Sequence, residues 1–372
     1  MAVAAPHASS PDVPPASVAV TIVTFNSARF IRRCIESVLD QNYPKVEIVV
    51  VDNASEDGTA EILEAFNDHC RIVCNRENTG FAGGQNQAIG YTRADWILTL
   101  NPDVLLMPGF IQALVRAGEA DPHIGTVCGK LRSMSPNYEI PEQPLIDSTG
   151  IYFTPALRHL DRGSRLPDNG QYEQFEFVFG ATAAAALYRR EMIEGISIDG
   201  EFFDNDFFAY REDADVAWRA QLLGWQCVYT PQALAYHVRS VLPENRRSYS
   251  AAINMHSVKN RWMMRIKNIT PGLYRRHFGS ITGRDLLVIA GCLTRELSSL
   301  RGYGTIVRKW SSLRRKRAQI MLKRCVDDAD LARWFSFSPV SFPALRVADQ
   351  VLASRAATAQ RDDAAKNTPP AD

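Results

Sequence analysis

The sequence predicts an α/β fold, in which a mostly parallel sheet is flanked by helices and followed by a basic helical region. Runs of β-branched and other apolar residues at 18–25, 46–51 and 96–100 are typical of strands that are buried on both faces. Stretches with helical spacing of apolar residues separate these runs. Strands that alternate with helices favour a parallel sheet with right-handed crossovers.

The predicted elements alternate along the first hundred residues. The expected strands are residues 18–25, 46–51, 71–73 and 96–100, and the expected helices are residues 31–39, 58–66 and 85–91. Polar clusters at 24–26, 52–55 and 101–103 each follow the carboxyl end of a strand. Taken singly, each cluster fits an ordinary turn or helix cap. Because ligands bind at this edge of open α/β sheets, the three clusters together predict a binding site there.

The composition is that of a globular protein. The chain has 372 residues, 46% hydrophobic and 22% charged, which is enough to bury a large core. Residues 1–16 are rich in Ala, Pro and Ser and predict a disordered tail. The longest charge-free apolar run, 286–294, is far shorter than the ~20 residues that span a bilayer. Seven scattered cysteines without a CxxC pair favour reduced thiols in the cytoplasm.

Charge is distributed unevenly along the chain. Residues 245–326 contain 19 Lys and Arg but only two acids, Asp285 and Glu296, so this segment carries +17 and the rest −16. Helical spacing at 251–266 and 284–300 predicts that the segment is helical. It has no RNP, zinc-finger or KH pattern, so we expect no nucleic-acid partner. An anionic membrane surface is the partner that it fits; the alternative is a solvated helical face.

Three carboxylates are crowded within four residues, at Glu212, Asp213 and Asp215, where a helix is expected at 213–223. Crowded acids repel one another unless a cation, a positive substrate or proton transfer uses them. Acids also favour the first turn of a helix, where the dipole is positive. Both interpretations stay open on this stretch alone.

Several ordered motifs resemble the family 2 glycosyltransferases, which have the GT-A nucleotide-sugar fold. Residues 18–59 are similar to the opening of that family, and residues 78–86 and 98–103 are similar to its next two segments. Residues 180–182, 187–190 and 208–219 resemble the acceptor half of its rhamnosyltransferase branch. The resemblance covers about residues 18–240.

The resemblance implies a domain organisation. The expected units are the tail at 1–16, a GT-A domain at 17–240 with a nucleotide-sugar half at 17–104 and an acceptor half at 105–240, a basic helical membrane-associating region at 241–330, and an extension at 331–372 whose end is disordered. Residues 141–175 are expected to be a long polar loop, either an acceptor-side lid or an insertion.

The donor site follows from the same resemblance. In the family an Asp-x-Asp motif holds a divalent cation on the donor diphosphate. Here the triplet is Asn101-Pro102-Asp103, so Asp103 is the implied ligand of Mn²⁺ or Mg²⁺. The implied donor-binding residues are Thr24, Phe25, Asn26, Asp52, Asn53, Gly80, Asn101 and Asp103. An aspartate at the base can accept from the imide N–H of uracil or thymine, which favours a UDP or dTDP donor.

His237 is the one histidine that we single out. It lies 24 residues beyond Asp213, about where some family members place a second metal ligand, and a neutral imidazole suits a cation beside one carboxylate. The alternative is a structural histidine at the end of an apolar run.

The base is also implied by the family. An inverting transferase needs a single carboxylate to take the proton of the acceptor hydroxyl, and family members place it in an acidic pair at the start of a helix. This makes Asp213 the base and Glu212 its catalytic neighbour. The implied acceptor-binding residues are Gly180, Ala181, Glu212 and Asp215.

The resemblance implies an inverting transferase that moves L-rhamnose from dTDP-L-rhamnose to a polyprenyl-diphosphate-linked glycan of the cell envelope. We expect it in the cytoplasm, peripheral on the inner face of the plasma membrane. A UDP-sugar donor is one alternative. Loss of the first acid at Asn101 leaves another open: a silent scaffold at the membrane that binds nucleotide-sugar or glycan. The retained Glu212-Asp213 pair and His237 argue against the scaffold.

Overall fold

The computed structural model describes residues 15–239 and 251–353. Most of the expected N-terminal tail, the start of the basic region at 240–250 and the end of the extension from 354 lie outside the described residues.

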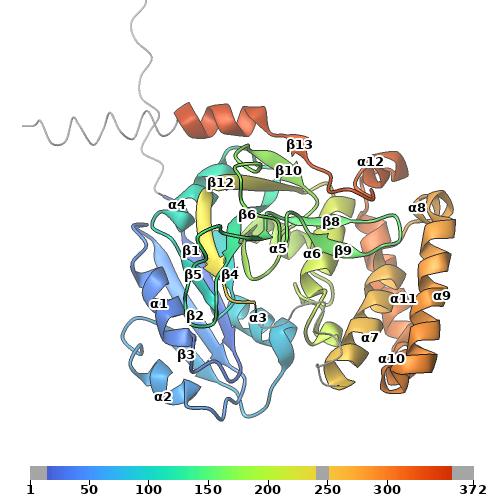
Figure 1. Ribbon diagram of the computed structural model, residues 1–372, viewed down its shortest axis with the longest axis horizontal. Helices are drawn as coiled ribbons and strands as arrows, with labels where there is room; N and C mark the ends of the chain where they lie inside the picture. Colours follow the sequence, from blue (N-terminus) through green and yellow to red (C-terminus); the bar gives the residue numbers. More distant parts are fainter. Residues whose placement is uncertain (1–14, 240–250, 354–372) are drawn as a thin grey trace, which may run out of the picture.

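A mixed sheet flanked by helices forms the body of the protein, and a group of helices lies beside it (Figure 1). Within the described residues the sheet has eleven strands: β13-β10-β12-β6-β11-β4-β1-β2-β3 in order, with β5 on β12 and β7 on β6. The strands are β1 (Val18–Thr24), β2 (Val46–Asp52), β3 (Arg71–Cys74), β4 (Trp96–Leu100), β5 (Val104–Leu106), β6 (Ile124–Ser133), β7 (Ile146–Ser148), β10 (Glu176–Val178), β11 (Ala185–Arg189), β12 (Gln226–His237) and β13 (Phe342–Pro343). The predicted α/β class with a helical C-terminal region is confirmed.

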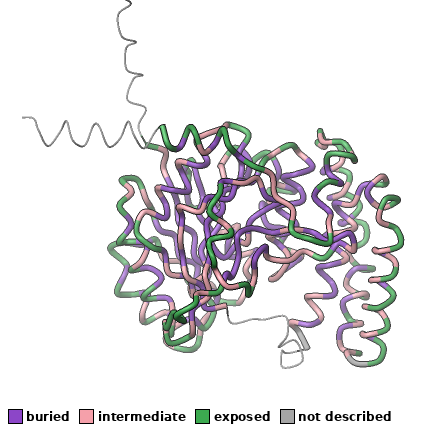
Figure 2. The backbone as a smooth tube through the Cα atoms, turned by 45° about the horizontal axis from the view of Figure 1, so that its top comes forward, coloured by how far each residue is buried: buried purple, intermediate pink, exposed green. Residues whose placement is uncertain are grey.

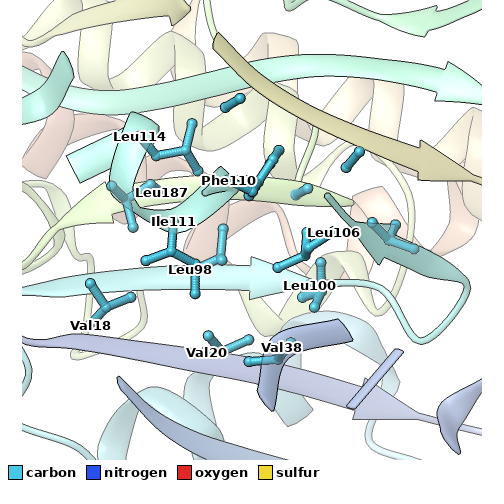
Figure 3. Packing of buried hydrophobic residues seen from close by; sticks show 14 of the residues in the cluster. Val18, Val20, Val38, Leu98, Leu100, Leu106, Phe110, Ile111, Leu114 and Leu187 are labelled. Atoms are coloured by element: carbon cyan, nitrogen blue, oxygen red, sulfur yellow. The ribbon is translucent and has the colours of Figure 1, made fainter. Parts of the chain in front are cut away.

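The nucleotide-sugar half is the parallel part of the sheet. Strands β4, β1, β2 and β3 are parallel neighbours, joined by α1 (Ile31–Leu39), α2 (Thr59–Glu64) and α3 (Gly80–Gly90). Alternate residues of β1 and β4 belong to one hydrophobic core with residues of α1 and α4 (Phe110–Glu119), as Figure 3 shows for Val20, Val38, Leu98 and Ile111. Helix α3 begins at Gly80 rather than after the glycines, so the glycine-rich stretch is its first turn.

In the expected acceptor half, some strands run antiparallel to their neighbours. Strand β11 lies antiparallel between β4 and β6, and β5 pairs antiparallel with β12. The expectation of a long polar loop at 141–175 was wrong in part, because this stretch contains β7, β8 (Ile151–Phe153) and β9 (His159–Asp161). Its hydrophobic residues alternate over only three positions at a time, too few to show as periodicity.

The helical region packs on α6 (Glu212–Leu222) through a second core. Its elements are α7 (Ala251–Asn268), α8 (Pro271–Arg276), α9 (Phe278–Arg295), η3 (Leu297–Leu300), α10 (Arg301–Arg308), α11 (Trp310–Lys323) and α12 (Asp328–Ala332). Trp218 of α6, Met263 of α7 and Leu313 of α11 are fully buried together in this core. Figure 2 shows the buried backbone running continuously from the sheet into these helices. None of the described helices is long and apolar enough to cross a bilayer.

The extension returns to the sheet. Strand β13 pairs with β10 at the sheet edge, and Ala344, Val347 and Val351 are buried in the first core. The described part of 331–372 therefore completes the domain that begins at residue 17.

Candidate active site

Thr24, Asp52 and Ser55 form one cluster at the carboxyl ends of β1 and β2. The parallel register sets Thr24 beside Asp52, and the Thr24 hydroxyl donates to Asp52 Oδ1 at 2.7 Å. Ser55 donates its N–H and its hydroxyl to the same carboxylate at 3.0 and 2.5 Å. Phe25 beside it is 50% exposed, and Asn26 accepts from the backbone of Glu56. The structure thus brings together the residues that the sequence predicts to bind the nucleobase and ribose of the donor.

Asn53 and Gly80 shape the neighbouring loop. The buried Asn53 donates from Nδ2 to Gly80 O at 3.0 Å and accepts at Oδ1 from Asn75 and Thr79. Gly80 has φ +78°, and a Cβ there would lie 2.4 Å from Phe208 O. Ala82 N–H donates to that carbonyl at 3.1 Å. Glycine is therefore required where the start of α3 meets the segment that precedes Asp213.

Asp103 and His237 meet because β5 begins directly after the Asn101-Pro102-Asp103 turn and pairs with the end of β12. The register sets Val104 opposite His237, and Val238 N–H donates to Asp103 O at 3.1 Å. His237 Nε2 lies 3.3 Å from Asp103 Oδ1. Asn101 is half-buried at the same turn, and its N–H donates to Ala184 O at 2.9 Å.

Three residues that the sequence reasoning missed complete this cluster. Asp147 of β7 contacts His237 Nδ1 at 2.8 Å, and its other oxygen lies 3.0 Å from Arg239 Nε. Arg239 Nη2 lies 2.6 Å from Asp161 of β9. Burial alone would lower the pKa of His237, but Asp103 and Asp147 raise it to about 10. Acids at 147 and 161 within a polar stretch were the available signal.

The contact between Asp103 and His237 partly fits a divalent cation. A carboxylate and an imidazole nitrogen face each other, and Asp147 on the opposite nitrogen would fix the ring, as carboxylates often do for ligating histidines. Among the described residues, however, no three His, Cys, Asp or Glu side chains surround one metal position. The chain offers two ligands, so phosphate oxygens and water would have to supply the others.

Asp213 lies in the first turn of α6 and accepts from Ala214 N–H at 2.7 Å and from the Ala183 backbone. Burial, followed by the charge of Asp161, raises its pKa from an ordinary 3.8 to about 6. Burial and Asp213 raise the pKa of Glu212 well above its usual range. Glu212 Oε2 has no hydrogen-bond partner among the described residues. Burial and neighbouring negative charge therefore raise the pKa of both carboxyl groups of this pair.

The segment before Asp213 has a strained backbone, and a helix of the C-terminal region holds it in place. Phe208, Tyr210 and Arg211 all have φ near +70°, which is costly for residues with a side chain. Asn260 of α7 places Nδ2 within 2.8–3.0 Å of three carbonyls, those of Phe207, Ala209 and Tyr210. Helix α7 thus stabilises the conformation that presents Asp213.

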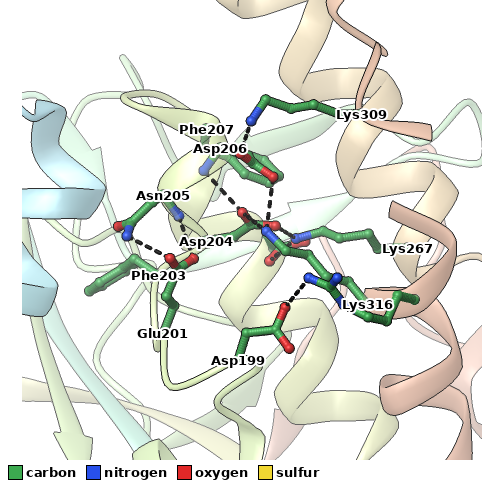
Figure 4. A network of polar contacts seen from close by, with 12 residues as sticks. Asp199, Glu201, Phe203, Asp204, Asn205, Asp206, Phe207, Lys267, Lys309 and Lys316 are labelled. Carbon is green, nitrogen blue, oxygen red and sulfur yellow. Dashed lines mark hydrogen bonds and ion pairs between the residues drawn. The ribbon is translucent and has the colours of Figure 1, made fainter. Parts of the chain in front are cut away.

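Asp215 is not available to an acceptor, which corrects the prediction that it binds one. Its carboxylate is fully buried and accepts from Arg219, Lys267 and Asn268 at 2.9, 3.0 and 2.8 Å. It belongs to a network in which Lys267, Lys309 and Lys316 reach Asp204 and Asp206 (Figure 4). These lysines of the basic region therefore bind acids of the sheet domain.

Gly180 and Ala181, predicted to bind the acceptor, are buried beside α6. A Cβ on Gly180 would lie 2.2 Å from Ala217 Cβ, so glycine lets α6 approach the sheet. Both residues line a small void with Asp213 and Tyr188. They pack directly behind Asp213, and a contact with acceptor stays a prediction.

Solved structures and a family model both resemble this chain. The fold is similar to that of GalNAc-T7, solved with UDP, GalNAc and Mn²⁺, with a TM-score of 0.55 and 13% identity over 69% of this chain and 48% of that chain. The GT-A class is thereby confirmed. Residues 19–196 match the model of Glycosyl transferase family 2.

Curated relatives agree with this assignment. The chain is 37% identical to the succinoglycan biosynthesis protein ExoO of Rhizobium meliloti, over 28% of this chain and 30% of that protein. It is 22% identical to the poly-beta-1,6-N-acetyl-D-glucosamine synthase of Staphylococcus epidermidis, over 59% and 49%. It is 26% identical to an N-acetylglucosaminyl-diphospho-decaprenol L-rhamnosyltransferase of Mycobacterium tuberculosis, over 59% and 75%. The matched regions thus cover less than half of the first two relatives.

Proposed function

We propose that this protein is an inverting glycosyltransferase that moves a sugar from a nucleoside diphosphate to a hydroxyl of a lipid-linked cell-envelope glycan. The observation that carries the proposal is Asp213, a largely enclosed carboxylate in the first turn of α6 with a pKa raised to about 6. A general base works best when its pKa is close to the operating pH. Asp213 accepts the hydroxyl proton as the acceptor oxygen attacks the anomeric carbon and the nucleoside diphosphate leaves.

The donor is proposed to be dTDP-L-rhamnose, bound at the sheet edge. Asp52, oriented by Thr24 and Ser55, suits the imide N–H of a pyrimidine, and the half-exposed ring of Phe25 can stack on a base. The M. tuberculosis relative, whose name specifies rhamnosyl transfer to N-acetylglucosaminyl-diphospho-decaprenol, supports the sugar and the acceptor class.

Asp103 and His237 are the residues that would hold Mn²⁺ or Mg²⁺. When bound, such a cation neutralises charge that develops on the leaving diphosphate. Arg239, which joins Asp147 to Asp161, keeps a positive charge between this cluster and Asp213. The charges of Arg239 and Asp161 therefore link the proposed cation site to the proposed base, Asp213.

A donor screen tests the proposal. Purified protein is incubated with UDP-, dTDP- and GDP-sugars and a short-chain polyprenyl-diphosphate acceptor, with and without Mn²⁺, and the product anomer is assigned by NMR. We expect transfer from dTDP-L-rhamnose, dependent on the cation, with inversion. Transfer from a UDP-sugar alone would show that the donor is a UDP-sugar and not dTDP-L-rhamnose. Donor binding without transfer from any sugar would favour the silent scaffold.

A further inference from the structure

Helix α9 has one face that nothing in the described chain covers. Its inner side is anchored by Ile281, Cys292 and Asp285, whose carboxylate forms ion pairs with Arg261 and Arg265 of α7. Its outer side exposes leucines instead: Leu286, Leu287 and Leu293 are 64%, 68% and 55% exposed, and Leu297 just after the helix is 66% exposed. Helix α9 lies at the outer edge of the molecule in Figure 1.

The exposed positions form a continuous stripe. Apart from Phe278 at the first position of the helix, they are Gly279, Gly283, Leu286, Leu287, Ala290, Leu293 and Thr294, which recur every three or four residues, and Leu297 follows just after the helix. A Cβ added at Gly279 or Gly283 meets nothing within 4 Å, so the stripe is open along its length. Every exposed position of this described helix from 278 to 294 is uncharged. Contiguous apolar surface of this kind marks an interaction site in proteins.

Four exposed arginines precede and follow the stripe in the chain, and we call these four residues the arginine rim. Arg275 and Arg276 are exposed immediately before α9, and Arg301 and Arg308 are exposed on α10 just after it. Val307 and Trp310 add exposed apolar surface there, at 74% and 49%. An amphipathic helix with leucines in the centre and arginines at the rim is the arrangement that lies in the headgroup region of anionic bilayers.

The basic residues inside the region do not contribute to this rim. Lys267 and Lys316 are buried against Asp204, and Arg315 pairs with Asp199. Part of the formal charge of the basic region therefore serves the contact with the sheet domain. The outward charge near α9 is what a partner would meet.

We infer that the α9 stripe, Leu286, Leu287, Leu293 and Leu297 with its arginine rim, docks the protein on an anionic phospholipid surface. A second copy of the chain is disfavoured as the occupant, because pairing two such faces would set their arginine rims against each other. The inference deepens the proposed function and rests on it for its purpose, since a surface-docked enzyme would meet a lipid-linked acceptor.

Vesicle sedimentation tests the stripe. The full chain is mixed with vesicles of phosphatidylcholine alone or with phosphatidylglycerol, and L286Q/L287Q/L293Q is compared with L39Q/L166Q/L345Q, three exposed leucines outside α9. We expect binding only to the anionic vesicles, weakened by salt, and a fall of at least ~tenfold in the α9 variant but not in the control. Equal binding of wild type and α9 variant, or no wild-type binding, would overturn the inference.

Two further measurements separate this inference from the proposed function. The α9 variant should transfer sugar to a short, water-soluble acceptor at the wild-type rate but lose transfer to acceptor embedded in vesicles. Vesicle binding without any transfer would reject the proposed function and leave the docking surface intact. A dimer in light scattering that the α9 variant dissociates would show a self-interface instead, and so would overturn the lipid assignment.

Discussion

The donor side and the base side of the site are each shaped by one buried asparagine, but the two asparagines act over different ranges. Asn53 follows β2 directly and holds the loop at 75–80 that leads into α3. Asn260 lies on α7 of the helical region and holds the carbonyls of 207–210, some fifty residues earlier in the chain. The donor side is built from neighbouring strand ends, whereas the base side depends on a remote domain.

This difference assigns a second role to the helical region. Its α7 and α11 supply Asn260, Lys267 and Lys316 to the segment that presents Asp213. The two lysines neutralise the buried carboxylate of Asp204. Under the proposed function, the region therefore supports the segment that carries the base, whatever surface its outer face contacts.

Replacing Asp213 by Asn should have the largest effect and should fall on the base side alone. The asparagine can keep accepting from the backbone N–H groups of Ala214 and Ala183, but it cannot take a proton. We expect kcat to fall ~10³-fold while the Kd of the donor, measured by calorimetry, stays unchanged. The exposed Asp121→Asn is the control; a donor Kd that weakens as much as kcat falls would contradict the separation of the two sides.

Replacing Lys267 by Met tests the remote support. The Lys267 ammonium lies between Asp204 and Asp215, and all three side chains are at most 3% exposed. Breaking a buried ion pair leaves an uncompensated charge, so we expect the free energy of unfolding in urea to fall by ~3 kcal/mol. Lys309→Met is the matched control, since Lys309 is 42% exposed and pairs with Asp206, for which ~0–1 kcal/mol is expected. A loss in Lys267→Met as small as that expected for Lys309→Met would show that the buried network is dispensable.

The same contrast separates what the sequence could predict from what it could not. The parallel strands and their polar ends are local patterns, so the cluster of Thr24 and Asp52 followed from them. The contact of Asp103 with His237 needed the resemblance, because it depends on an antiparallel pairing between segments more than 130 residues apart. Asp147 and Asp161 lie on three-residue strands that show no periodicity.

For Asp215, the sequence suggested a role in acceptor binding that the structure does not support. Its place beside Glu212 and Asp213 suggested a shared function, yet the three carboxylates point into different surroundings. Asp215 is 0% exposed and meets Lys267 from a helix some fifty residues later. A local sequence window contains no signal for a partner that is so distant.

A pair of asparagine variants should distinguish the two sides directly. Asn260→Ala removes the amide that holds Phe207, Ala209 and Tyr210, so we expect kcat to fall by ~10–30-fold with little change in donor Kd. Asn53→Ala removes the amide that holds Gly80, so we expect donor Kd to rise with a smaller change in kcat. Steady-state kinetics and calorimetry on both variants check this. The same parameter changing in both would show that the loops act as one unit through the contact between Gly80 and Phe208.

The pH dependence should be the smallest effect and the most specific to the base. Ionised Asp213 is the active form and its pKa is about 6, so kcat should be level above that pH and fall about tenfold per unit below it. Burial and the charge of Asp213 raise the pKa of Glu212 well above its usual range. Asp161→Asn removes a negative charge that raises the pKa of Asp213 and a partner of Arg239, whose charge lowers it. Both changes favour the carboxylate, so the midpoint of the kcat profile should move below pH 6, while Asp121→Asn leaves it in place; a midpoint that rises would show that another group is the base.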